Sequence, residues 1–521
     1  MAKNSPIERR SLRLIVMTIA VASLLALTAA VAAEGHTASS SSEQEQSASY
    51  KNMQLLAQDT LDGFGNGGEG FAMKLTESGR RILYVAHEEG PKCFSVLDVT
   101  RPSSPELLSQ TDVPNENVRC NSLDLSGDTL AVGQQTGVDQ EGAGLRLYSV
   151  SDPINPSEVG FFDTSGPYSR GVHFVWFADG RYAHLSTGAP DFEPRRLGSD
   201  CNEEACDDQV YMIVDLADPT NPKEVGRWWY PGTREGDTDP APEPNPGVDS
   251  GVRVHNVNVF PGRPDRAYIG YLDGGVVVLD ISDKTQPEQV AILDYVPPSP
   301  GFSHTALPLF SRELLVVTDE AVRDECEDGL KLLWLMDIST ETSITPIATA
   351  PLPTDTFELC QGGGRFGAHN VYENHPDEPT WQSDHIVVGS FFSGGVRVYD
   401  LSDPFHPEEV AYYVPPAPED SEAGAIQIND VYVDDRGLIY AVDRHVGGLY
   451  ILEMELPGTV GEGSPPDPRT GATAAQIPET GGPSLLPFVA VAVLLSSGLL
   501  GLLARVHRWC ASRGPTENHE P

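Results

Sequence analysis

The chain has 521 residues, with 76 Asp and Glu against 34 Lys and Arg, and a formal net charge of −42. This balance excludes a large nucleic-acid surface, because affinity for phosphates comes mainly from Lys and Arg. The 50 Gly and 43 Pro residues, together with several short apolar runs, favour a turn-rich β protein over a helical one.

Residues 1–33 have the pattern of an export signal. Basic residues precede an apolar stretch over residues 14–28, and an Ala-Val-Ala cleavage motif follows at residues 30–32. An uncleaved N-terminal membrane anchor is the alternative interpretation. The adjacent Arg9 and Arg10 weakly resemble a twin-arginine signal, which leaves the export route open. A Ser-rich linker is expected over residues 34–49.

One pattern recurs between residues 50 and 457. A short apolar strand ends in an acidic residue, an Asp-Pro turn and a second Pro follow, and another strand begins. Its clearest copies cover residues 147–153, 212–219, 277–283 and 396–404, and weaker copies cover residues 95–102, 333–340 and 450–456. The copies lie 51 to 66 residues apart, which suits four-stranded blades with loop insertions. The sequence therefore predicts an all-β fold, a seven-bladed β-propeller of four-stranded antiparallel blades.

The copy at residues 212–219, Met-Ile-Val-Asp-Leu-Ala-Asp-Pro, resembles the LVIVD repeat family. The resemblance extends over roughly residues 50–457 and implies a β-propeller. It says little about activity, because one fold hosts many activities.

The units also predict how the domain closes. The fourth unit is expected to have strands over residues 252–260, 266–271, 275–281 and 288–295. The seventh unit stops after residues 450–456 and lacks an outer strand. Residues 53–57 are expected to supply it, so that an N-terminal strand completes the last blade and removes an open edge.

Six of the seven cysteines lie in the repeat region, an even number that suggests disulfides in an exported domain. A metal-thiolate site is the less favoured reading, because the sequence has no CxxC pair. Fifteen pairings exist in principle. Local spacing and matching positions in neighbouring units favour Cys93–Cys120, Cys201–Cys206 and Cys326–Cys360.

Long insertions fall in loops that open onto one face of a propeller, where function usually lies. They cover residues 187–209, 232–250, 320–330, 354–367 and 415–425. Near the same face, His87, His184 and His445 are interpreted as solvated loop residues, with the lining of a pocket as the alternative.

Four histidines occupy matching positions on the predicted inner strands of units three to six, and Asn occupies that position in units two and seven. Imidazoles on rigid strands can bind Cu, Fe or Zn, usually with an acceptor behind each ring. By strand position, the nearby acceptor candidates are Asp430, Glu320 and Asp319. The predicted metal ligands are His173, His255, His304 and His369. The predicted channel-lining polar residues are Asn121, Asn256, Asn370, Asn429 and Asp430.

Two alternatives to a transition-metal site stay open. Propeller channels are polar, so the repeated histidines can be structural hydrogen-bonding residues inherited from one ancestral blade. The acidic stretches at residues 234–243 and 417–422 lack EF-hand spacing, so a Ca²⁺ site there would be non-standard.

Four-histidine iron sites on propeller inner strands occur in carotenoid-cleaving oxygenases, and metal-linked propellers occur among methanethiol oxidases. Both are analogies of fold rather than of sequence.

A Pro- and Gly-rich linker over residues 458–481 ends in a short motif that resembles the LPxTG cell-wall sorting signal. The motif consists of Ile477, Pro478, Glu479, Thr480 and Gly481. The resemblance implies that a sortase cuts between Thr480 and Gly481, with Ile477 standing where that family has Leu.

Residues 482–504 have the length and hydropathy of a transmembrane segment, and residues 505–521 form a basic tail expected on the cytoplasmic side. A plain C-terminal membrane anchor is the alternative to sortase attachment. Both readings place the domain on the outer surface of the cell.

Two functions from different classes follow. The first is a surface-displayed binding or scaffold module that recognises a glycan, a peptide or a small molecule through its loop-rich face. The second is an extracellular metal-dependent oxidase or oxygenase that uses the four histidines. The sequence leaves open whether the protein is an enzyme, and it identifies neither the ligand nor the metal.

Overall fold

The computed structural model describes residues 47–455, except residues 199–200, 202–203, 244, 246–248 and 378. The chain divides into the units Met1–Thr459 and Val460–Pro521, and every described residue belongs to the first. The predicted export signal, the sorting motif at residues 477–481 and the apolar segment at residues 482–504 lie outside the described residues. Within the described ranges, no helix has the length and apolar character needed to cross a membrane.

The described chain is built almost entirely from short β-strands, which pair antiparallel within each sheet. One eight-stranded sheet consists of β3 (Gly67–Leu75), β4 (Arg81–His87), β5 (Lys92–Asp98), β6 (Glu106–Asp112), β7 (Arg119–Ser126), β8 (Thr129–Gln135), β9 (Gly144–Ser149) and β10 (Ser157–Asp163). Its two halves are joined by a single pairing between His87 and Cys120.

The other sheets have four strands each. Three of them follow chain order: β11 (Val172–Trp176), β12 (Tyr182–Thr187), β13 (Val210–Asp215) and β14 (Lys223–Trp228); β15 (Val257–Phe260), β16 (Arg263–Gly270), β17 (Val276–Asp280) and β18 (Glu288–Leu293); β19 (Ser303–Leu309), β20 (Leu314–Asp319), β21 (Leu333–Asp337) and β22 (Thr345–Thr349). Two include an N-terminal strand: β1 (Ser49–Lys51) with β23 (Ile386–Ser390), β24 (Val396–Asp400) and β25 (Glu408–Val414); β2 (Met53–Asp59) with β26 (Ile428–Val433), β27 (Leu438–Asp443) and β28 (Leu449–Met454). The short helices are η1 (Leu61–Gly63), η2 (Phe310–Arg312), η3 (Asp324–Cys326) and α2 (Thr356–Gln361).

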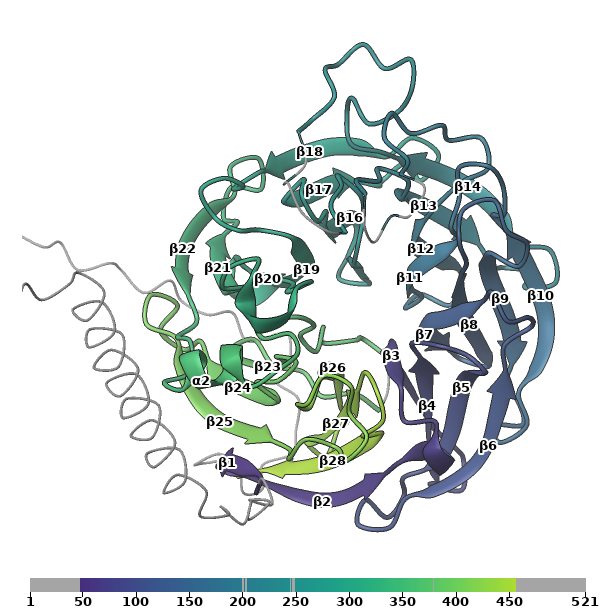
Figure 1. Cartoon of the computed structure of the whole chain (residues 1–521). Helices are drawn as coiled ribbons and strands as arrows, with labels where there is room; N and C mark the ends of the chain where they lie inside the picture. Colours follow the sequence, from purple (N-terminus) through teal and green to yellow (C-terminus); the bar gives the residue numbers. More distant parts are fainter. Residues whose placement is uncertain are drawn as a thin grey trace, which may run out of the picture. The chain divides into compact units, whose positions relative to one another are not determined.

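Figure 1 shows these sheets arranged around a common centre. The strands β7, β11, β19 and β26 lie toward the centre, whereas β6, β10, β14, β18, β22 and β25 lie at the periphery. The middle strands are almost fully buried, as in β20 and β27, because neighbouring sheets cover both of their faces. The predicted all-β class is confirmed, and the arrangement is consistent with a β-propeller.

The repeated aspartates act as turn residues. The carboxylate of Asp280, at the end of β17, accepts a hydrogen bond from the Ser282 backbone N–H at 2.9 Å. The same contact, to the N–H two residues later, recurs at the ends of other third strands, namely at Asp98, Asp215, Asp337 and Asp400. Such a carboxylate satisfies a backbone donor that leaves the ladder, which explains why the repeat ends each strand with Asp.

The inner strand of the fourth unit is shorter than predicted. The sequence predicts a strand over residues 252–260, whereas β15 begins at Val257. The Asn256 N–H donates to the His304 carbonyl oxygen, which belongs to the neighbouring sheet, and its own carbonyl accepts from Gly270. Because the backbone here divides its hydrogen bonds between two sheets, it cannot continue a regular ladder.

The N-terminal segment contributes to two sheets. β2 pairs with β28 along its whole length, the pairing predicted for residues 53–57. β1 pairs with β25 in the adjacent sheet, which the sequence did not indicate. Two sheets therefore take their edge strand from the far end of the domain.

Two histidines expected in solvated loops are instead buried. His87, on β4, has Nδ1 2.7 Å from the Asn66 side-chain oxygen and Nε2 2.7 Å from the Ser95 hydroxyl. His184, on β12, has Nδ1 2.7 Å from the Tyr211 hydroxyl. The solvated-loop prediction is wrong for both, because the second strands that carry them are covered by neighbouring strands.

These buried imidazoles predict a loss of stability in acid. Burial lowers the pKa of His87 to about 4 and the pKa of His184 to about 3. The unfolded chain takes up these protons near pH 6.5, before the folded protein does. The free energy of unfolding is therefore highest above about pH 6.5, and it falls as the pH drops toward about 4 for His87 and about 3 for His184. Each histidine should contribute a slope of up to about 1.4 kcal/mol per pH unit. In urea unfolding, His184→Phe should have a shallower dependence on pH than the parent protein, and an equal slope would contradict this assignment.

Candidate functional site

The four predicted histidines come together in one cluster. His173 lies on β11, His304 on β19, and His255 and His369 lie in the extended segments before β15 and β23. Their rings form a row, with centroids 4.3 Å apart from His173 to His255, 3.8 Å from His255 to His304 and 4.3 Å from His304 to His369. Four segments far apart in the sequence thus supply one cluster, named here the histidine cluster.

Irregular pairing turns these side chains inward. The register of β11 with β12 shifts at His173, and the register of β19 with β20 shifts at His304. The shift that contains Asn121 on β7 and the shift that contains Asn429 on β26 fall at matching places. A bulged residue is released from the ladder and its side chain is re-aimed, so the repeated bulges account for the shared direction of His173 and His304.

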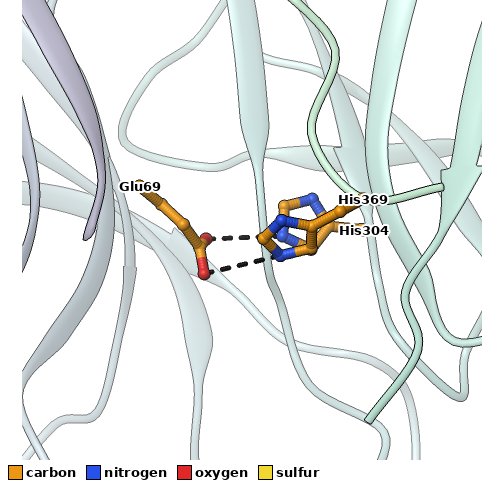
Figure 2. A group of neighbouring side chains, drawn as sticks. All are labelled: Glu69, His304 and His369. Atoms are coloured by element: carbon orange, nitrogen blue, oxygen red, sulfur yellow. Dashed lines mark ion pairs between the residues drawn. The ribbon is translucent and has the colours of Figure 1, made fainter. Parts of the chain in front are cut away.

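Glu69 completes the cluster and was missed by the sequence reasoning. It lies in a register shift on β3, with Oε2 3.3 Å from the His304 Nε2 and Oε1 3.6 Å from the His369 Nε2. Figure 2 shows its carboxylate facing both rings. Glu69 Oε2 also lies 4.0 Å from the His173 Nε2. The available signal was a single acidic residue between glycines in the segment Gly67-Gly68-Glu69-Gly70.

The glycines let β3 come close enough to place this carboxylate. A Cβ on Gly68 would lie 2.4 Å from the Asn121 carbonyl oxygen, and a Cβ on Gly70 would lie 2.4 Å from the Leu123 backbone nitrogen. Both contacts are with backbone atoms, which cannot rotate away. Glycine is therefore required on both sides of Glu69.

Gly68→Ala should push Glu69 away from the histidines. Overpacking of this kind costs about 1–3 kcal/mol, and displacement of the carboxylate should weaken any metal bound by the cluster. Thermal unfolding and metal content measured on the same sample test this expectation. Gly79→Ala is a control for the glycine replacement itself, because its Cβ would meet nothing within 4 Å, although its positive φ adds local strain. Unchanged stability in Gly68→Ala would contradict the close approach.

Glu320 faces the cluster from the end of β20. Its carboxylate lies 3.7 Å from the His369 Nε2 and 3.9 Å from the His255 Nε2, and Arg365 donates to it at 3.1 Å. Burial raises the pKa of Glu320 to about 7. Of the three acceptor candidates taken from strand position, only Glu320 reaches the histidines.

Asp319 and Asp430 make other contacts. Asp319 accepts hydrogen bonds from the Tyr295 hydroxyl and the Trp334 ring N–H, so its side chain belongs to the packing of β20 against β21. Asp430 accepts from the Val431 N–H, and burial raises its pKa well above the ordinary value. Neither aspartate is therefore an acceptor for the four histidines, because both side chains bind other groups.

The predicted channel asparagines are all buried. Asn256 donates to the Asn370 side-chain oxygen at 3.0 Å and to the Glu373 carboxylate at 2.8 Å. Asn429 donates to the Gly67 carbonyl oxygen at 3.1 Å, which ties β26 to β3. Asn256, Asn370 and Asn429 are therefore buried polar residues beside the histidines. Asn121 is also buried, and its side chain has no hydrogen-bond partner within the described part of the chain.

Each imidazole presents Nδ1 to an acceptor. The Nδ1 of His369 lies 2.6 Å from the Asn429 carbonyl oxygen, and a carbonyl can only accept. The Nδ1 of His304 lies 2.8 Å from the Thr305 hydroxyl, which donates onward to the Asn370 side-chain oxygen. Both rings therefore carry their proton on Nδ1, which leaves Nε2 with a lone pair.

The same tautomer follows for the other two rings. The Nδ1 of His173 lies 3.0 Å from the Gln135 Oε1, which also accepts from Arg119. The Nδ1 of His255 lies 2.9 Å from the Asn256 Oδ1, whose amide nitrogen donates elsewhere. All four rings thus direct a lone pair on Nε2 toward the centre. Metal-binding histidines have this arrangement, with an acceptor behind each ring.

The Nε2 atoms of His173 and His255 face each other, and neither carries a proton that could form a hydrogen bond between them. The Nε2 atoms of His173 and His255 lie 2.8 Å apart. Burial lowers the pKa of all four imidazoles, which disfavours an additional proton on either. A metal ion bound to both would account for the contact, because ligands at right angles and about 2.1 Å from a metal lie about 3 Å apart.

Other ligand atoms of the cluster are also unsatisfied. The Nε2 atoms of His304 and His369 and the Oε2 atom of Glu69 are buried without a hydrogen-bond partner among the described residues. Three groups have ligand atoms within 4.8 Å of one another, namely Glu69 with His304 and His369, Glu69 with His173 and His255, and Glu320 with His255 and His304. The donor set is electron-rich and suited to a cation.

A cavity of about 80 Å³ adjoins the cluster. His173, His255, Glu69 and Glu320 form part of its lining, and the rest consists of Gln209 and charged residues, mostly from the surrounding loops. Those loops follow second strands or precede first strands, as the predicted long insertions do. The cavity is named here the arginine cavity, after the five arginines in its wall, Arg119, Arg170, Arg253, Arg365 and Arg444.

Three disulfides occur among the described residues, and they have the predicted partners. Cys93–Cys120 joins β5 to β7, Cys201–Cys206 closes a short loop before β13, and Cys326–Cys360 joins η3 to α2. Asp208 lies near the Cys201–Cys206 pair. Both sulfur atoms of that pair are oxidised, so they cannot act as thiolate ligands. Cys120 directly follows Arg119 of the arginine cavity, and the Cys206 carbonyl oxygen accepts a hydrogen bond from Arg253 of the same cavity.

Comparison with known proteins gives one family. The profile of the LVIVD repeat matches residues 205–229 and residues 265–294. The first segment contains β13 and β14, and the second contains β17, β18 and most of β16. No curated protein matches the chain significantly. The matched segments are similar to LVIVD repeats, which are typical of β-propeller proteins, and the match agrees with the four-stranded sheets described above.

Proposed function

We propose that this protein is a metal-dependent enzyme whose histidine cluster holds a transition-metal ion. The observation that carries the proposal is the 2.8 Å contact between the Nε2 atoms of His173 and His255, both of which have Nδ1 bound to an acceptor. Without a cation, two neutral rings would direct lone pairs at each other. His304 and His369 offer two further nitrogen ligands, and Glu69 and Glu320 offer carboxylates.

The ligand set favours Fe, Cu or Zn over Ca²⁺ or Mg²⁺, because imidazole suits the former and the latter prefer all-oxygen sites. Structural metal sites are closed, whereas catalytic sites keep an open position. The arginine cavity meets the cluster at His173 and His255, where a substrate would reach the ion. An oxidase or oxygenase is the reaction class that we infer, since four neutral imidazoles suit redox-active Fe and Cu.

We also propose that the domain is a seven-bladed propeller. The two halves of the eight-stranded sheet count as two blades, joined only through His87 and Cys120. The pairing of β2 with β28 supports closure of the last blade by the N-terminal strand. Such closure would hold the four histidine-bearing segments at fixed positions.

Export to the cell surface is part of the proposal. Three disulfides suit an oxidising compartment, and the signal-like residues 1–33 and the sorting-like residues 477–481 agree with it. A sortase or the membrane would then hold the C-terminal segment.

A ligand-binding module is the second candidate. A cavity of about 1040 Å³, separate from the cluster, lies among loops that include Asn115, Gly137 and Cys201. Cavities of this size accommodate glycans, peptides or small molecules. Binding that survives complete removal of metal would favour this function.

The test is the metal content of the protein purified without an affinity tag. About one Fe, Cu or Zn ion per chain is expected, with an electron paramagnetic resonance or visible absorption signal if the ion is Fe or Cu. A protein that contains no stoichiometric transition metal, and binds none when it is supplied, would refute the proposal.

A further inference from the structure

The arginine cavity concentrates positive groups in an acidic protein. Five arginines line it, although the chain has only 34 Lys and Arg against 76 acidic residues. Four carboxylates share the lining, namely Glu69, Glu88, Asp249 and Glu320. The guanidiniums therefore slightly outnumber the carboxylates, and a divalent ion in the histidine cluster would add two further positive charges.

Four of these arginines are held in place by buried carboxylates, and Asp208 holds Arg170 with hydrogen bonds of 2.8 Å and 3.1 Å. The Glu88 Oε1 accepts from the Arg119 Nη1 at 2.6 Å and from the Arg444 Nη2 at 2.7 Å. The Glu320 Oε1 accepts from the Arg365 Nη1 at 3.1 Å. All three carboxylate side chains are at least nine-tenths buried. Arginines fixed in this way are preorganised for a ligand, because little side-chain freedom is lost when they bind it.

Arg365 retains unused N–H donors and is partly exposed to solvent, so it can bind a ligand. Arg365 donates to Glu320 and packs against the Phe392 ring at 5.6 Å, and its side chain is 24% exposed. Each guanidinium has five N–H donors, so most of those on Arg365 are unused by the described residues. Arg444, which Glu88 holds, lines the same small cavity as Arg365, so two positive charges face one space and repel each other. An anion between them would relieve this repulsion.

We propose that the arginine cavity binds the carboxylate group of a small substrate, with Arg365 and Arg444 as its main contacts. This inference rests on the proposed metal centre, because it names the class of molecule brought to the ion. Planar guanidinium and carboxylate groups match in shape and can form paired hydrogen bonds. A volume of about 80 Å³ suits such a small group, and the four acidic residues in the wall favour a monovalent anion over phosphate.

The experiment compares acetate with acetamide, its uncharged counterpart of equal shape, by isothermal titration calorimetry. Acetate should bind the metal-loaded protein and acetamide should not. Arg365→Gln and Arg444→Gln should each weaken acetate binding about tenfold or more, whereas Arg181→Gln, an exposed arginine paired with Asp215, should not. Circular dichroism and metal content measured on the same samples show whether each variant is folded and loaded.

The outcomes separate this inference from the metal proposal. Equal binding of acetate and acetamide, or acetate binding unchanged in both arginine variants, would overturn the carboxylate site while leaving the metal content as found. Tighter arginine-dependent binding of inorganic phosphate than of acetate would overturn the choice of carboxylate. If the protein takes up no metal, the metal centre fails, and arginine-dependent acetate binding would still support the anion site.

Discussion

His255→Ala should remove the metal from the histidine cluster. We expect the purified variant to contain less than about a tenth of the metal of the parent protein. Loss of groups that only support a ligand costs about 10–100-fold in metal affinity, so loss of a ligand should cost more. The side chain is buried, its Nε2 faces both His173 and Glu320, and its Nδ1 is held by Asn256. Elemental analysis after dialysis against a mild chelator provides the measurement.

The control for this variant is His406→Ala. The His406 side chain is 82% exposed and is paired only with Asp403 within the described structure, so it lies outside the cluster. Metal content should be unaffected. If His255→Ala kept its metal, or if both variants lost it equally, the cluster would not be the binding site. A fall in unfolding temperature with no effect on metal binding would instead support a structural role for the histidines.

Removal of β1 and β2 should destabilise the whole domain. β2 buries Met53 against the core that also contains Leu452 and Tyr440, and loss of one buried Met side chain alone costs about 2–5 kcal/mol. Deleting the segment also exposes the edges of β25 and β28, which would then be free to pair with other chains. A chain that begins at residue 60 should therefore unfold at lower urea concentration than a chain that begins at residue 47, and it should aggregate more readily.

A peptide of residues 47–60 gives a second test of the same pairing. Added to the shortened protein, it should raise the urea midpoint, because it can occupy the two vacant edges by strand addition. A peptide with Met53→Asp should not, since a charge would enter the core. Equal midpoints for the long and short chains would contradict a structural role for the N-terminal strands.

Much of the fold was predictable because it is repeated. The strand–Asp–Pro pattern has a local cause, the hydrogen bond from a carboxylate such as Asp280 to the N–H two residues later. Matching positions in neighbouring units likewise predicted the four histidines and the pairs Cys93–Cys120 and Cys326–Cys360, whereas Cys201–Cys206 followed from local spacing. In a repeated fold, residues at matching positions of different units occupy matching places in neighbouring sheets, so comparing the units predicts which residues lie close together.

The rest depended on contacts that do not repeat. Glu69 appears in one unit only, and its position depends on the close approach of Gly68 and Gly70 to the neighbouring strand. β1 is three residues long and pairs with a strand more than three hundred and fifty positions away, as in Tyr50 with Tyr413. Neither periodicity nor turn chemistry marks such a partner. Burial of His184 was missed because the sequence reading placed it in a loop, whereas it lies on β12 and its ring stacks on Tyr211 of β13.

The distant pairing of β2 also constrains the order in which the protein can be completed. Gln54 and Glu453 are 399 positions apart and share a hydrogen bond of 2.6 Å. At about 5–20 residues per second, a ribosome needs roughly 20–80 s to make the intervening chain. Throughout that time β2 has no partner, so its backbone donors and acceptors are open to pairing with other chains. A product of premature termination would keep this strand unpaired, so proteases could distinguish an incomplete chain from a finished one by its first ordered segment.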